Sequence, residues 1–218
     1  MSQADAAVEV AGERLRLLPE RAVWWERAET LVVADLHWGK AAAFRASGVP
    51  IPAGTTAAGL ARLADVVART GARRLAVLGD LFHARAGMAP RTLEAIAEWR
   101  AAHPELEVLL VRGNHDRHAG DPPAGLRFEV VNGPWRLAPF VLRHEPAPAP
   151  EGYVLAGHLH PGIRLHGAGR QSVRLPCFAF GRTVALLPAF GEFTGLAERE
   201  PREGDRVYII AGDEVIRV

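Results

Sequence analysis

The sequence has very little cysteine, and this limits both its covalent structure and its chemistry. Cys177 is the single cysteine among 218 residues, so the chain cannot form an internal disulfide bond. It lies in the segment RLPCFAF, whose apolar residues predict a buried and unreactive thiol. A cysteine nucleophile is the alternative, and the same apolar neighbours disfavour it.

Long apolar runs and an excess of one charge are also missing. No apolar run approaches the length of a membrane span, and the first ten residues lack the pattern of a secretory signal. We therefore expect a cytoplasmic protein with no membrane partner. The 26 basic and 25 acidic residues nearly cancel, which disfavours an obligate nucleic-acid coat protein. A nucleic-acid substrate stays open, because arginines can cluster near a site.

Lysine is almost absent as well. Lys40 is the single lysine, and all other basic residues are arginines. It follows the segment ADLHWG, where an ammonium group could meet a phosphate as a point charge; a leftover surface lysine is the alternative. Arg45 comes about one turn later and is expected to point the same way. Arg164, Arg170 and Arg174 are a candidate track for a polyanion, with solvated loop arginines as the alternative.

Short apolar runs and helical patterns alternate in the first half of the chain. Apolar periodicity predicts helices over 55–70, which ends at Gly71, and over 90–104, which ends at Pro104. Buried strands are expected in TLVVAD, RRLAVLGD and LEVLLVRGNHD. Short strands dominate elsewhere, over 7–10, 13–18, 22–26, 126–131, 135–144, 152–160, 163–167, 172–180, 184–190, 206–210 and 214–218.

This order of elements predicts an α/β fold. Strand–helix alternation followed by a run of strands implies two mixed β-sheets packed face to face, with helices outside them. We therefore expect a four-layer αββα sandwich, formed by one domain over 1–218. A tandem tryptophan pair in the strand AVWWE is expected to place one ring in the core.

Polar residues gather where the predicted strands end. They are Asp35, His37, Asp80, Asn114, His115, His144, His158 and His160. Ligands of α/β sheets bind at the carboxyl ends of strands, so these segments are expected to converge on one place. In GHLHPG, an extended chain would put both imidazoles on one side, and that spacing suits either one metal or two.

The whole set of side chains favours a pair of divalent ions. Four histidines, two aspartates and an asparagine make a mixed nitrogen and oxygen set that is too large for one tetrahedral zinc. The absence of thiolates disfavours a structural zinc site. Without metal, such a buried cluster would carry a heavy desolvation cost.

The motifs D-x-H, G-D, G-N-H-D, a single His and G-H-x-H, in this order from Asp35 to His160, resemble those of the calcineurin-like metallophosphoesterase superfamily. That family has an αββα fold, in agreement with the layers argued above. More narrowly, ADLHWGKAAAFR, GDLFHAR, GNHD and GHLHPG resemble the bacterial ligase-associated DNA damage response endonucleases. Those are Mn-dependent phosphodiesterases associated with a DNA ligase and a helicase.

The resemblance implies a role for each motif residue. The first metal would be held by Asp35, His37 and His160, the second by Asn114, His144 and His158, and both by Asp80. The ions are expected to be Mn²⁺, although Fe, Co and Zn suit the same ligands. They would activate a water molecule for attack on phosphorus.

Three further residues are expected to act beside the metal ligands. His115 would protonate or stabilise the leaving oxygen, and Asp116 would accept a hydrogen bond from its other ring nitrogen. Many relatives have an acidic residue where this chain has His83, which is expected to face the substrate or to support a ligand.

We expect a phosphodiesterase that acts on DNA, single-stranded or flapped. A small-molecule phosphoesterase that acts on a cyclic nucleotide, a nucleotide pyrophosphate or a phosphomonoester is the alternative. A protein-binding scaffold without catalysis is a more distant one, because a scaffold is free to lose ligands and every ligand position here is filled.

Overall fold

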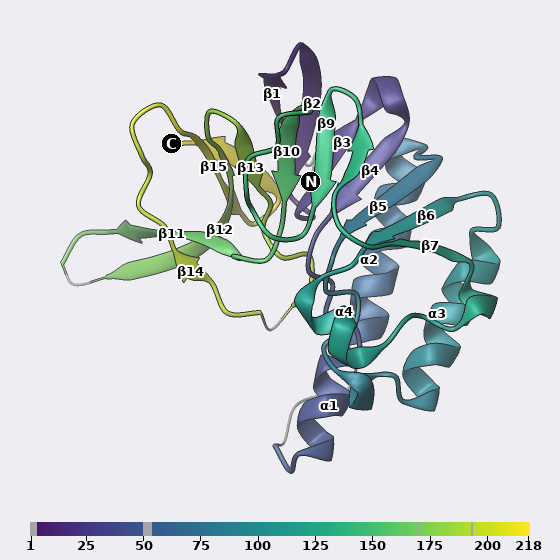
Figure 1. The fold of residues 1–218 in the computed structure, drawn as a ribbon. Coiled ribbons are helices and arrows are strands. Elements are labelled where there is room, and N and C mark those ends of the chain that lie inside the picture. Colours follow the sequence, from purple (N-terminus) through teal and green to yellow (C-terminus); the bar gives the residue numbers. More distant parts are fainter. Residues whose placement is uncertain (1–3, 50–53, 170, 193) are drawn as a thin grey trace.

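Two β-sheets lie face to face at the centre of the molecule (Figure 1). The structure is a computed structural model that describes residues 4–49, 54–169, 171–192 and 194–218. The first sheet has seven strands, in the order β1 to β7. They are β1 Ala6–Val10, β2 Glu13–Leu18, β3 Ala22–Trp25, β4 Thr30–Val33, β5 Arg74–Leu78, β6 Glu107–Val111 and β7 Phe128–Val131. The strands from β4 to β7 are parallel, and β1 to β4 pair antiparallel.

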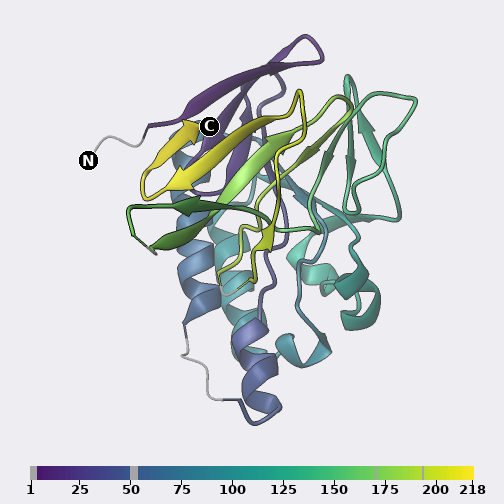
Figure 2. The same cartoon turned by 90° about the vertical axis from the view of Figure 1, so that its left-hand side faces the viewer.

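The second sheet is also mixed and has nine strands. Its order is β14-β11-β12-β13-β10-β9-β8, and β15 joins β12 to β16. The strands are β8 Trp135–Leu137, β9 Phe140–Arg143, β10 Tyr153–Ala156, β11 Pro161–His166, β12 Ser172–Phe180, β13 Val184–Leu186, β14 Ala197–Glu198, β15 Arg206–Ala211 and β16 Glu214–Arg217. β12 pairs with β11 along its first half and with β13 and β15 along its second. The β11–β12 hairpin therefore projects from the sheet as an arm (Figures 1 and 2).

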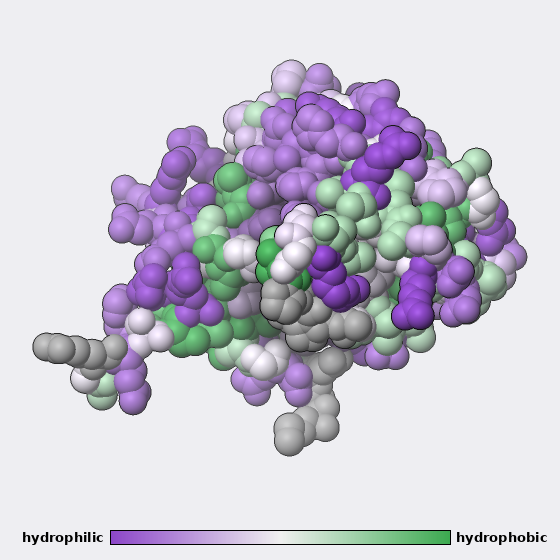
Figure 3. All heavy atoms as spheres, turned by 90° about the horizontal axis from the view of Figure 1, so that it is seen from below, coloured by the Kyte–Doolittle hydropathy of each residue, from purple (hydrophilic) through white to green (hydrophobic). Residues whose placement is uncertain are grey.

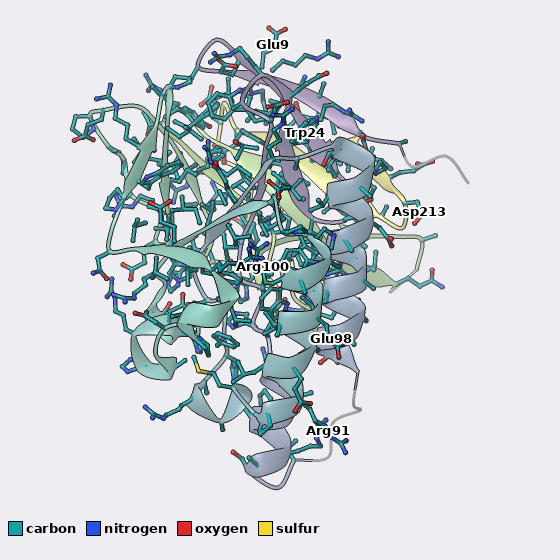
Figure 4. The ribbon with its side chains drawn as sticks, turned by 90° about the vertical axis from the view of Figure 1, so that its right-hand side faces the viewer. Glu9, Trp24, Arg91, Glu98, Arg100 and Asp213 are labelled. Atoms are coloured by element: carbon teal, nitrogen blue, oxygen red, sulfur yellow. The ribbon has the colours of Figure 1, made fainter. Side chains whose placement is uncertain are left out.

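The helices α2 and α3 pack on the outer face of the first sheet (Figure 2). The helices of the described residues are α1 Lys40–Ala46, α2 Thr55–Thr70, α3 Pro90–Ala102, α4 Asn114–Ala119 and the short 3₁₀ helices η1 Glu26–Ala28, η2 Arg85–Gly87 and η3 Ala124–Leu126. The predicted helix over 55–70 is confirmed, with Gly71 in the left-handed conformation at its end. α3 ends at Ala102, just before Pro104. Figure 4 shows Arg91 and Glu98 on the outward side of α3.

The first sheet is covered on both faces, and this explains its continuous apolar strands. One core packs the sheet against α2 and α3, and a second core fills the space between the two sheets. Trp24 belongs to the first and Trp25 to the second, with 4% and 2% of their surfaces exposed. We expected one core ring from this pair; both rings are buried, because successive side chains of a strand face opposite cores.

A fourth layer of helices was expected on the outer face of the second sheet, and the described residues do not form one. Two face-to-face mixed sheets with helices are confirmed, but all helices of the described residues lie before residue 127. The outer face of the second sheet has its own smaller core, which contains the buried Cys177. A proline-rich loop packs on it through Ala149 instead of a helix. In the described part of the chain, no helix is long and apolar enough to cross a membrane.

Candidate metal centre

The polar residues that follow the strands meet on the side of the sheets where α4 begins (Figure 1). Asp35 and His37 follow β4, Asp80 follows β5, and Asn114 and His115 open α4 directly after β6. The second sheet supplies His144 after β9, and His158 and His160 after β10. Within each sheet these strands run parallel, so their carboxyl ends share one edge. The structure thus brings the five segments together, as the sequence predicted.

The backbone is strained at most of these positions. Asp35, His37, Asp80, His158 and His160 all have positive φ angles, between 45° and 71°. Each such residue costs of order 1 kcal/mol, so it persists only where the surroundings hold it. Here the neighbouring loops do so: the His37 N–H donates to the Asp80 carbonyl at 2.8 Å. Strain that collects at one cluster of polar residues marks a functional site.

These angles correct one prediction. His158 and His160 do not sit on an extended chain, so their imidazoles do not simply share one side. The Nε2 atom of His160 lies 3.4 Å from Nε2 of His37, whereas Nδ1 of His158 lies 3.0 Å from Nε2 of His144. The left-handed turns send one ring to each of two clusters. This split suits two ions better than one.

The first cluster consists of Asp35, His37 and His160. The Asp35 Oδ1 atom lies 3.5 Å from Nε2 of His160, and these three side chains offer ligand atoms within 4.8 Å of one another. Oδ2 of Asp35 accepts the His158 backbone N–H, but the buried Oδ1 has no hydrogen-bond donor among the described residues. A buried carboxylate oxygen left in this way fits a cation. The residues present therefore suit the metal that their types predict.

The second cluster consists of Asn114, His144 and His158. The Asn114 Oδ1 atom lies 2.8 Å from Nε2 of His144 and 3.1 Å from Nδ1 of His158. His144 donates its Nδ1–H to the Leu78 carbonyl at 2.9 Å, so its Nε2 lone pair faces the cluster. Lone pairs that crowd together at such distances fit a shared cation.

Asp80 lies between the two clusters. Its Oδ1 is 3.5 Å from Nε2 of His144, and its Oδ2 is 3.9 Å from Nε2 of His37. Each oxygen thus faces a different cluster, which is the position expected of a bridging ligand. Burial raises the pKa of Asp80, and the nearby Asp35 carboxylate raises it further. Bound cations would oppose both effects and favour the ionised carboxylate.

The ring of His37 is electrically neutral in this environment. Burial, followed by the proximity of His160 and Lys40, lowers the pKa of His37 to about 2. A neutral imidazole keeps the lone pair that a metal needs. The same pattern holds for His83, whose pKa falls to about 4 because of burial and the charge of Lys40. Burial also lowers the pKa of Lys40 itself.

Two glycines allow the loops to approach each other closely. A Cβ atom on Gly79 would lie 2.3 Å from Nδ1 of His144, and one on Gly113 would lie 2.2 Å from Oδ1 of Asp80. Any side chain at either position would push a site residue aside. Both glycines stand directly before a site residue, which is why the motifs read GD and GNHD.

The role expected of Asp116 is wrong in one respect. Asp116 does not accept from the ring of His115; its buried carboxylate accepts the backbone N–H groups of Asp80, Leu81 and Gly113 at 2.8–2.9 Å. His115 instead donates its Nδ1–H to the His83 carbonyl at 2.7 Å. Asp116 thus fastens two loops together, while a backbone oxygen sets the tautomer of His115. Its Nε2 lies 4.0 Å from Oδ2 of Asp80 and faces the centre.

Two of the three predicted substrate-binding residues, His83 and Lys40, lie beside this centre. The His83 ring stacks on His115 at 5.0 Å between centroids, and Lys40 is half-buried at the start of α1. Arg45 is exposed in the last turn of α1, five residues after Lys40, and therefore lies about 140° around the helix from it. The two do not share a face.

The arginine track is only partly in place. Arg164 and Arg174 are opposite each other on the β11–β12 arm, but Glu198 already pairs with Arg164 at 2.7 Å. Arg170 lies outside the described residues.

Fold and site together define a metal-dependent phosphoesterase. Residues 29–176 match the model of the calcineurin-like phosphoesterase family, so the chain belongs to that family. Its catalytic centre is binuclear, in accordance with the two clusters and the bridging position of Asp80.

A solved structure is similar over the whole chain. The nuclease MPE of Pseudomonas putida is 45% identical, with a TM-score of 0.87, and the match covers 98% of this chain and 100% of that one. The phosphoesterase YfcE from E. coli is 18% identical, with a TM-score of 0.40, and the match covers 84% of this chain and 88% of the other. No curated protein matches significantly.

Proposed function

We propose that the protein is a Mn²⁺-dependent nuclease that hydrolyses phosphodiester bonds in single-stranded or flapped DNA. The observation that carries this proposal is the full-length similarity to the Pseudomonas putida nuclease MPE, at 45% identity. The exposure of the site agrees with a large substrate, because Asn114, His115, His158 and His160 are all partly exposed. An extended strand can therefore reach the metal centre from outside.

The chain's own residues have distinct tasks in this reaction. Asp35, His37 and His160 would hold one divalent ion, Asn114, His144 and His158 the other, and Asp80 both. When bound, the ions supply an activated water and positive charge near the phosphoryl oxygens.

His115 donates a proton to the leaving oxygen. Its Nδ1–H is held by the His83 carbonyl, so Nε2 carries the proton that moves. Lys40 contributes a positive charge beside His37 and His83, in the place where a phosphate of the strand would lie.

One set of assays tests the proposal. The protein with Mn²⁺ is incubated with bis-p-nitrophenyl phosphate, p-nitrophenyl phosphate, and labelled single-stranded, flapped and fully duplex oligonucleotides. We expect turnover of the diester, cleavage of the single-stranded and flapped DNA, and little turnover of the monoester. Monoester turnover without DNA cleavage would favour a small-molecule phosphoesterase. No turnover of any substrate, with no Mn²⁺ bound, would favour a scaffold.

Two broader expectations accompany the proposal. Association with a DNA ligase and a helicase stays a prediction, which co-purification from a bacterial host would test. The cytoplasmic location likewise stays a prediction.

A further inference from the structure

Phe44 is an aromatic residue that the cores do not use. It lies on the short helix α1, which buries Ala41 and Ala43 instead. Among the described residues it belongs to none of the three apolar cores and does not pack against their edges. Its ring is only partly buried. A phenylalanine placed in this way gains little from the hydrophobic effect, so its position calls for another explanation.

The ring of Phe44 continues a column of rings that starts in the metal centre. His83 stacks on His115 at 5.0 Å with an interplanar angle of 25°, and Phe44 stacks on His83 at 5.4 Å with an angle of 16°. One face of Phe44 is thus covered by His83. Among the rings of the described residues, Phe44 is the last in this column, two ring spacings from the proposed proton donor His115. Nearly parallel planes make this face ready to extend the stack.

A positive charge accompanies the end of the column. Lys40 precedes Phe44 by one helical turn, and its Nζ lies 5.9 Å from the centroid of the Phe44 ring. The same ammonium is close enough to lower the pKa values of His37 and His83. It therefore lies near both the metal centre and Phe44. An aromatic face beside a basic group is the combination with which proteins bind single-stranded nucleic acid.

We propose that the outer face of Phe44 is a nucleobase-binding subsite, on which a base next to the scissile phosphate stacks. This inference rests on the proposed nuclease function and adds a binding element to it. The site would take any base, because every base has a flat π-face. Lys40 would meet the phosphate between that base and the metal centre. Figure 3 views the molecule from below, the side on which α1 lies in Figure 1, and shows hydrophobic and hydrophilic residues intermixed on this face.

A substrate that lacks one base tests this subsite directly. The probe is a single-stranded oligonucleotide with one phosphodiester bond, flanked by cleavage-resistant linkages. Matched versions carry an abasic sugar on the 5′ or the 3′ side of that bond. Wild-type protein and Phe44→Leu are compared on each version by kcat/KM with Mn²⁺. Phe44→Tyr, which keeps a flat ring, serves as the second variant.

The expected result is a loss that is not additive. Removal of the base on one side should lower the wild-type kcat/KM about tenfold, within the range known for base stacking on aromatic rings. Phe44→Leu should lose about as much on the intact strand and almost nothing more on the abasic one. Phe44→Tyr should behave like the wild type.

Two outcomes would overturn the subsite. An equal loss for Phe44→Leu on intact and abasic strands would mean that Phe44 only positions His83. Wild-type protein indifferent to both abasic sugars would mean that no base is bound.

A matched variant and the intact substrate keep the two proposals apart. Tyr153→Leu removes a partly buried aromatic ring at the opposite end of β10 from His158, and it should leave the abasic effect unchanged. Cleavage of the intact oligonucleotide by the wild type tests the nuclease function itself. If that cleavage occurs while Phe44→Leu loses the same factor in kcat/KM on intact and abasic strands, only the subsite is wrong.

Discussion

His144 and His115 each use one ring nitrogen to donate to a backbone carbonyl, and this decides which nitrogen faces the metal centre. The acceptors are Leu78 and His83, which are 66 and 32 residues away along the chain. The sequence identifies the histidines by their motifs, but a carbonyl acceptor exists at every residue and leaves no signal. For this reason the support of His115 was wrongly assigned to the adjacent Asp116.

The position of His115 leads to a prediction about catalysis. His115→Gln keeps a polar side chain but cannot deliver a proton, so turnover should fall about a hundredfold or more. Metal binding should not change, because the proposed ligands are all left intact. Oligonucleotide cleavage and metal content per chain are the two measurements. Unchanged cleavage would remove the role given to His115.

At the scale of elements, glycine-containing loops bring the site together. Motifs such as GNHD predict these loops, because a glycine stands next to polar residues after an apolar strand. The local shape was less predictable: α1 has only seven residues, too few to show a helical apolar period, and Pro139 splits the expected strand over 135–144 into β8 and β9. His158 and His160 adopt left-handed angles because contacts from the first sheet hold them, and those contacts are invisible in a local pattern.

Gly113 offers a test of this close loop packing. In Gly113→Ala the new methyl group would meet Oδ1 and the backbone nitrogen of Asp80 at 2.2 and 2.6 Å, so the loop must shift. We expect at least a tenfold loss of activity, weaker Mn²⁺ binding and a stability cost of about 1–3 kcal/mol. Gly125→Ala is the matched control, since its methyl group would meet nothing within 4 Å. Equal behaviour of the two variants would contradict the packing argument.

At the scale of the whole molecule, two cores lie on the two faces of the first sheet and a third lies outside the second. The fold class followed from the order of strands and helices, because continuous apolar strands need cover on both faces. The missing fourth layer could not be foreseen, since an apolar strand shows that a face is covered but not by what. The loop that contains Ala149 covers part of the outer face of the second sheet, where a helix was expected.

Cys177 reports on this third core through the pH dependence of stability. Burial raises the pKa of the thiol from 9.0 to about 12. The folded state therefore keeps the neutral thiol while the unfolded chain ionises, so stability is complete below pH 9 and falls between pH 9 and 12. Relative to Cys177→Ala, the free energy of unfolding should fall by about 1.4 kcal/mol more per pH unit in that window.

Urea denaturation of both proteins at pH 8, 9.5 and 10.5 measures the difference. Cys177→Ala is the control for the wild type, because the two proteins share all other titrating groups. Parallel pH curves would mean that the thiol ionises in the native protein and that the third core is open to solvent.

The ligands are divided between the two halves of the chain. Asp35, His37, Asp80 and Asn114 come from the first sheet, and His144, His158 and His160 from the second. A cation bound by these ligands would cross-link the two sheets, since the two halves of the chain cannot separate without releasing it. Part of the free energy of metal binding would then appear as resistance to denaturation. An enzyme of this design is hardest to unfold in the state in which it is ready to work.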